Sequence, residues 1–262
     1  MKPMRLALLV LLSCTTAFIP KTAGTKWLID KHRDYRMLYT AEDRKNKKVY
    51  AKLIDNGIKF SKTFFDYPFV KKFDVLIHPD RHSLDSTWQK DWNLSSFKSE
   101  CWMVASGVGE KLDMLTPRQW EKEACEHSYA DNKKTQQLVT HELIHVYHGQ
   151  VNASHDFSDV EGIDWFVEGL ATYASGQCDA AWLDHIDDAL KKNEIPGTLD
   201  SFWMGRLRYG LSGSVVMYLD QQYGRSKTKE LMSVTRKAEL FSSLDIDEAR
   251  LLAGWKSFIQ AR

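Results

Sequence analysis

The stretch of sequence that decides both fold and chemistry reads KKTQQLVTHELIHVYH and covers residues 133–148. Its hydrophobic spacing predicts a single helix. The shorter sequence HELIH, residues 141–145, lies inside that helix, and residues four positions apart lie on one helical face. His141 and His145 can therefore present both imidazoles to one metal ion, while Glu142 beside them can reach a water on that ion.

Zinc in a hydrolytic site takes three protein ligands and keeps an open position for water. The extended pattern H-E-x-x-H-x-x-G-x-x-H does not supply the third ligand here. His148 stands where that pattern needs glycine, and Val151 stands where it needs histidine. His148 itself has two open interpretations: it lines the cleft, or it is a solvated histidine near the end of its helix.

A carboxylate on a following helix supplies the third ligand instead. Residues 165–173 read WFVEGLATY and fall within a helix predicted over residues 159–175. Glu168 offers the carboxylate, and Gly169 next to it lets a neighbouring helix approach closely. We therefore expect one Zn²⁺ per chain, held by Glu168 and the two histidines of HELIH.

The sequences HELIH and WFVEGLATY together resemble those of the gluzincin metallopeptidases, within the peptidase MA group. The resemblance covers roughly residues 100–260. It implies a zincin-like fold and a zinc peptidase in which His141, His145 and Glu168 bind the metal and Glu142 is the general base. The aminopeptidase motif G-x-M-E-N is absent from the sequence, so the resemblance carries over no specificity for a free N-terminus.

A later helix, predicted over residues 206–223, resembles a helix that follows the zinc motifs in many proteins of this group. In gluzincins a Tyr or His at that place donates a hydrogen bond to the oxyanion, which makes Tyr209 the candidate. An aromatic residue that only packs at the start of a helix is an equally open interpretation. Arg206 and Arg208 either bind a substrate carboxylate or are exposed charges at the helix start.

These residues predict an exported zinc peptidase in which zinc activates a water and Glu142 takes its proton. The strand expected at residues 101–105 would pair with an extended peptide, by analogy with the family. Two other functions stay open: an exported binding or interaction protein with a non-catalytic zinc site, and a zinc hydrolase for a non-peptide amide or ester. The intact Glu142 argues against the first, because a structural site needs no base.

The pattern along the chain predicts an α+β fold. We expect a small N-terminal α/β lobe with a short sheet, then a mainly helical C-terminal lobe from residue 116 onward, with the zinc site at their junction. No linker interrupts the pattern, so residues 24–262 are expected to form a single domain. Residues 24–40 show no clear period. The first long helix and the three clearest strands are expected at residues 42–65, 73–77, 101–105 and 111–115.

The first residues are typical of a secretory signal peptide. Lys2 and Arg5 precede an apolar run at residues 6–12 that is too short to span a bilayer, and cleavage near residue 17 is expected. A periplasmic or extracellular location follows. The sequence before Cys14 also resembles a lipobox, which leaves open a lipoprotein anchored there. No later stretch approaches about 18 apolar residues, so no transmembrane segment is expected.

The charge balance of the chain restricts its partners. Its 262 residues hold 36 Lys+Arg and 35 Asp+Glu, for a formal net charge of +1. A nucleic-acid-binding protein would show a basic domain or stripe, so we expect no nucleic-acid partner. A peptide or protein substrate is the partner that the motifs indicate.

Export also bears on the cysteines. In an oxidising compartment the natural count for Cys101, Cys125 and Cys178 is one disulfide and one free thiol. A bridge between Cys101 and Cys125 would close a loop of about 25 residues, worth roughly 3 kcal/mol. The spacing favours this pair, but the sequence does not decide the pairing.

Overall fold

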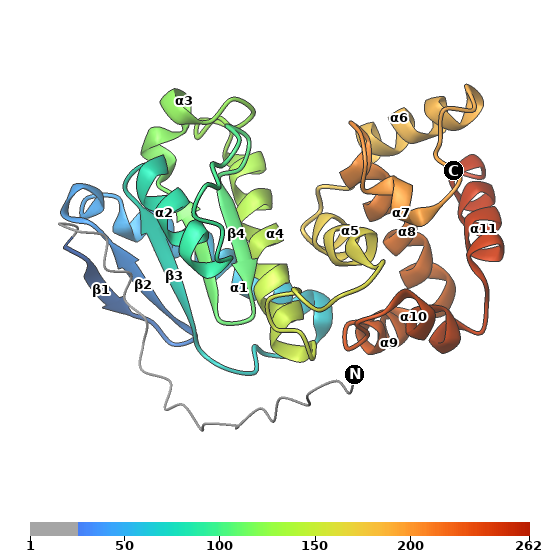
Figure 1. Ribbon diagram of the computed structural model, residues 1–262, viewed down its shortest axis with the longest axis horizontal. Coiled ribbons are helices and arrows are strands. Elements are labelled where there is room, and N and C mark those ends of the chain that lie inside the picture. Colours follow the sequence, from blue (N-terminus) through green and yellow to red (C-terminus); the bar gives the residue numbers. More distant parts are fainter. Residues whose placement is uncertain (1–25) are drawn as a thin grey trace, which may run out of the picture.

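The computed structural model describes residues 26–262, so the expected signal peptide and Cys14 lie outside the described residues. The fold is mixed α+β. Figure 1 shows a small sheet with its helices in one half and a helical half formed by the C-terminal part of the chain. The helix that carries HELIH lies between them, on the side of the sheet that faces the helical half. No helix among residues 26–262 has the length and apolar character needed to cross a membrane.

The sheet has five strands in the order β1-β2-β3-β5-β4. β2 pairs with β3 and β3 with β5 in parallel, whereas β1 and β4 each join antiparallel at an edge. The edge position of β4 leaves one side of that strand open toward the cleft described below. The strand bounds are β1 Leu28–Lys31, β2 Tyr35–Tyr39, β3 Phe73–His78, β4 Ala105–Val108 and β5 Lys111–Leu115.

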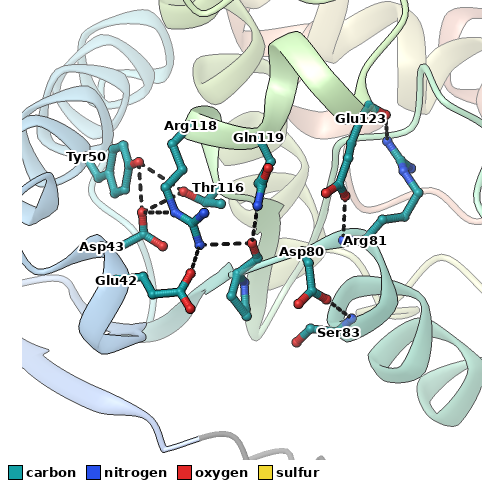
Figure 2. Close-up of polar contacts among 11 residues, drawn as sticks. Glu42, Asp43, Tyr50, Asp80, Arg81, Ser83, Thr116, Arg118, Gln119 and Glu123 are labelled. Carbon is teal, nitrogen blue, oxygen red and sulfur yellow. Dashed lines mark hydrogen bonds and ion pairs between the residues drawn. The ribbon is translucent and has the colours of Figure 1, made fainter.

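The strand expected at residues 101–105 is wrong in its position, because β4 begins only at Ala105. Arg81, the first residue of α2 (Arg81–Asp91), explains the difference. Its guanidinium donates hydrogen bonds to the carbonyls of Glu100, Cys101 and Met103, at 2.9–3.1 Å, and so holds this segment as a turn. Figure 2 shows that the same side chain also reaches Glu123, whose carbonyl it meets at 2.7 Å.

A disulfide closes the same region. Cys101 and Cys125 are joined, and Cys178 is a buried free thiol. This pairing is the one that the spacing suggested. Together with Arg81, the bridge fixes the segment that leads into β4.

A buried polar cluster joins the start of α1 (Lys47–Phe65) to the segment after β5. The carboxylate of Asp43 is fully buried and accepts hydrogen bonds from Thr116 at 2.8 Å and from Tyr50 and Arg118 at 3.2 Å (Figure 2). A buried charge is costly unless it is paired and hydrogen-bonded, so this set fixes the orientation of α1 against the sheet. The helix was expected from residue 42, but residues 41–43 form a separate 3₁₀ turn.

Close packing then places α4 (Asn132–Val151) against its neighbours. A side chain at Gly57 of α1 would bring its Cβ within 2.5 Å of Leu143 on α4, so the two helices pack at the distance that glycine permits. Residues 139, 143 and 146 form the apolar stripe that holds α4 in the core.

The helical half is built around α5 (Asp164–Ala174) and α8 (Arg208–Tyr223). A Cβ at Gly169 would lie 2.4 Å from the carbonyl oxygen of Ser212, which confirms the expected close approach of a helix at that glycine. The surrounding helices are α6 Ala180–Lys191, α7 Leu199–Phe202, α9 Arg225–Leu231, α10 Lys237–Leu244 and α11 Glu248–Gln260. The short helix α3 Trp120–Glu123 lies in the half that contains the sheet (Figure 1).

Candidate metal centre

Two helices, α4 and α5, bring three metal-binding side chains to one point. The Nε2 atoms of His141 and His145 lie 3.0 Å apart, and Oε2 of Glu168 lies 3.3 Å from the first and 3.4 Å from the second. A tetrahedral ion with bonds of about 2.0–2.2 Å would place its ligand atoms roughly 3.3–3.6 Å apart. Two imidazole nitrogens and one carboxylate oxygen are also a donor set that zinc accepts, so these residues fit such an ion.

The histidines are almost fully buried, whereas Glu168 is reached from the cleft. His141 and His145 are each 6% exposed, and the side chain of Glu168 is 26% exposed. Burial alone would raise the pKa of Glu168, but His145 and His141 outweigh it and hold that pKa below its usual value. Glu168 is therefore a charged carboxylate directed at both imidazoles.

Gln177 holds His141 from behind. Its Oε1 lies 2.7 Å from Nδ1 of His141 and accepts a further hydrogen bond from Ser175 at 3.2 Å. An amide oxygen only accepts, so Nδ1 carries the imidazole proton and Nε2 presents its lone pair to the cluster. Gln177 was not among the residues predicted from the sequence. Its signal is weak: a polar residue just after Gly176, which ends the helix of Glu168.

Glu142 lies beside the cluster and against the edge strand. A Cβ at Gly107 of β4 would come within 2.1 Å of the carbonyl oxygen of Glu142, so strand and helix are in direct contact. Burial raises the pKa of the Glu142 carboxyl to about 7; His141 and the Gly107 backbone oppose the rise, and Glu168 adds to it. A carboxyl with such a pKa can both accept and return a proton near neutrality.

The comparison with protein families agrees with this geometry. The model of the Peptidase MA superfamily matches residues 128–261, which is just over half of the chain and includes α4, α5 and α8. This chain belongs to the peptidase MA superfamily. A search of curated proteins finds no match. Membership indicates a metallopeptidase-like protein with peptides or proteins as substrates, and the cluster on α4 and α5 is where this superfamily member could hold its metal.

In this peptidase MA chain the cluster opens into a cleft of about 730 Å³. Strand β4 forms one wall, through residues 105–108, and the start of α8 contributes to the other. Aromatic side chains from distant parts of the sequence complete the lining: Trp88, Trp92, Trp102, Trp182 and Trp203. No local pattern gathers these tryptophans, and only the tertiary fold brings them together.

Tyr209 stands in the first turn of α8 and lines the same cleft. Its ring centre lies 6.1 Å from that of His141, in an edge-on arrangement. Burial raises the pKa of Tyr209, the charge of Glu168 adds to the rise, and Arg208 opposes it. The phenol therefore keeps its proton and is a hydrogen-bond donor beside the cluster.

Both interpretations of His148 are wrong. The side chain is fully buried, and its Nε2 donates a hydrogen bond to the carbonyl of Met232 at 3.0 Å. Burial lowers the pKa of His148 to about 3, so the imidazole is neutral. His148 ties α4 to the segment after α9 and contributes nothing to the cleft.

Proposed function

We propose that this chain is an exported zinc peptidase of the gluzincin type, with the metal held by His141, His145 and Glu168. The observation that carries the proposal is the convergence of two Nε2 atoms and one carboxylate oxygen at the floor of a cleft, with Glu142 beside them. A bound zinc ion supplies Lewis acidity, which lowers the pKa of a coordinated water. Family membership favours a peptide substrate.

The residues of the chain divide the remaining work. Glu142 takes the proton of the attacking water, and it returns a proton to the leaving amine as the C–N bond breaks. Gln177 keeps His141 in the tautomer that presents Nε2 to the metal. Tyr209 donates a hydrogen bond to the oxygen of the attacked carbonyl, where negative charge develops.

Substrate binding uses the edge of the sheet. β4 pairs with β5 on one side only, and its residues line the cleft. An extended peptide can add to such an edge through backbone hydrogen bonds. Because Gly107 has no side chain, the β4 backbone lies directly beside α4. We further propose that residues 24–262 fold as one unit after export and cleavage near residue 17.

The test measures zinc content and peptide cleavage together. The purified protein is expected to bind one equivalent of zinc and to cleave a peptide library, and a chelator should stop the cleavage. His141→Ala and Glu168→Ala should each lose zinc, while Glu142→Gln should keep zinc and lose activity. Zinc binding without cleavage of any peptide would refute the peptidase and favour a binding protein or a non-peptide hydrolase. Unchanged zinc content in both alanine variants would refute the ligand assignment.

A further inference from the structure

Arg208, the first residue of α8, places its guanidinium in the cleft among three aromatic rings. Its Cζ atom lies 4.7 Å from the ring centre of Trp102, 5.2 Å from that of Trp203 and 5.1 Å from that of Tyr209. Trp102 leads into β4, whereas Trp203 and Tyr209 belong to the helical half. The guanidinium therefore contacts both walls of the cleft, and its position is fixed by stacking.

No carboxylate neutralises this cation. Among residues 26–262, no ion pair joins Arg208 to an aspartate or glutamate, although several carboxylates line the same cleft. Two of those carboxylates have other partners: Asp179 lies 3.6 Å from Lys133, and Asp156 accepts hydrogen bonds from Ser158. A half-buried guanidinium without an acidic partner is a place where an anionic ligand group can bind.

The chemistry of the guanidinium narrows the ligand. Aromatic rings lie close to the guanidinium, and it also interacts with the hydroxyl of Tyr209. Its five N–H groups lie in one plane, so more than one donor stays free for a ligand. That planar fork matches the two oxygens of a carboxylate, which it binds through parallel charge-assisted hydrogen bonds. The lysine in the cleft lining offers no equivalent, because the side chain of Lys134 is 79% exposed and lies 4.0 Å from Asp131.

The distance from Arg208 to the metal cluster fits a peptide. The Tyr209 ring is close to both groups, 6.1 Å from the ring of His141 and 5.1 Å from Cζ of Arg208, and these two distances together set the upper limit of their separation. This upper limit corresponds to about three residues of extended chain, at ~3.4 Å each. A peptide attacked at the cluster can therefore place a carboxylate on Arg208 without leaving the cleft.

We propose that Arg208 is a carboxylate-binding subsite, and that the cleft selects peptides with a carboxylate within about three residues of the cleaved bond. The inference rests on the proposed peptidase function and extends it to a substrate class. The carboxylate is either a free C-terminus or an Asp or Glu side chain, which share this chemistry. Arg208 is thus a specificity residue, and Arg206, two positions earlier and exposed outside the cleft lining, is not.

A binding experiment on the zinc-loaded Glu142→Gln protein tests the subsite without turnover. N-acetylated hexapeptide libraries, ending in a free carboxylate or in an amide, are titrated while the tryptophan fluorescence is followed. A second pair of libraries, both amidated, carries Asp and Glu or their amides Asn and Gln at one position. Where Arg208 is intact, the carboxylate member of at least one pair should bind about 10-fold tighter or better.

Variants at two arginines decide the result. Arg208→Met, an uncharged side chain of similar reach, should abolish the preference, and the matched Arg206→Met should keep it. Arg208→Lys keeps the charge but loses the planar fork, so it should weaken the preference for the carboxylate. If Arg208→Met does not fold, Arg208→Lys replaces it as the test variant. The pair that shows the preference identifies the source of the carboxylate.

The results that would overturn the subsite differ from those that would overturn the peptidase. Equal binding within both library pairs, absence of binding, or a preference that survives Arg208→Met would each refute the role of Arg208. A carboxylate preference in binding, together with no cleavage by the zinc-loaded wild type, would refute the peptidase and leave the subsite standing. Peptide cleavage without any carboxylate preference in binding would refute the subsite and leave the peptidase standing.

Discussion

Substitution of Gln177 tests the metal centre without removing a ligand, because this side chain contacts His141 on the side away from the metal. Its Oε1 accepts the Nδ1 proton of His141 at 2.7 Å, and the imidazole is 6% exposed. Gln177→Leu keeps much of the side-chain volume but removes the acceptor. The Nδ1–H group is then left buried without its partner, and the imidazole loses the contact that fixes its tautomer and orientation.

The expected loss follows from that single hydrogen bond. Removing an outer partner of a metal-binding histidine typically costs about 10- to 100-fold in metal affinity. This range corresponds to about 1.4–2.7 kcal/mol, which agrees with ~1–3 kcal/mol for leaving a buried donor unsatisfied. We therefore expect Gln177→Leu to raise the zinc Kd about 10- to 100-fold. Gln177→Glu, which retains an acceptor, should bind zinc at least as tightly as the wild type.

Competition with a chromogenic chelator measures the zinc Kd of each variant at one pH. Gln136→Leu is the matched control: Gln136 lies on α4, the helix that carries His141, and its Nε2 donates a half-buried hydrogen bond to the carbonyl of Leu53 at 2.9 Å, but the side chain touches no ligand. Its zinc Kd should stay within about 2-fold of the wild type. If Gln177→Leu also stays within that range, the hydrogen bond to His141 does not position the ligand and the reasoning is refuted.

Two further predictions concern the frame around the site. Gly107→Ala puts a Cβ within 2.1 Å of the α4 backbone and should lower both Tm and peptidase activity. Gly197→Ala is the control: no heavy atom lies within 4 Å of its Cβ, so neither quantity should change. Equal Tm values for the two variants would contradict the close packing of β4. Asp113 is buried, which would raise its pKa, but His78 and Lys111 hold that pKa below the usual value. The ionised Asp113 carboxylate therefore stabilises the fold above about pH 4, and this stabilisation is lost as the pH falls through the lowered pKa. Asp113→Asn should cost about 3–5 kcal/mol in urea unfolding at pH 7 and should flatten the loss of stability below pH 4; an unchanged acid limb would show that this carboxylate does not govern it.

Local patterns in the sequence predicted the parts of the site that a single helix carries. The spacing of His141 and His145 depends only on helical geometry, and Glu168 stood out because Gly169 and its aromatic neighbours marked a second packed helix. The structure brings these three side chains together. Tyr209 also lies in the cleft, although its hydrogen bond to substrate stays a prediction.

Features that depend on tertiary contacts were not predictable in this way. The tryptophan lining comes from segments more than 100 residues apart, and Gln177 meets His141 only because α5 folds back on α4. The start of β4 was misplaced because Arg81, distant in sequence, holds residues 100–103 as a turn. Strand β2 (Tyr35–Tyr39) escaped notice for a related reason: four of its five residues are buried, so it shows no alternation of polar and apolar side chains.

The measurement that tests the central claim most directly is the rate of peptide cleavage by zinc-loaded wild type and zinc-loaded Glu142→Gln, with zinc content determined on the same samples. Because glutamine cannot take up the proton of the attacking water, we predict equal zinc content and a fall in kcat of about 10²-fold or more. Cleavage by Glu142→Gln at the wild-type rate, with zinc bound, would contradict the proposed base and with it the mechanism.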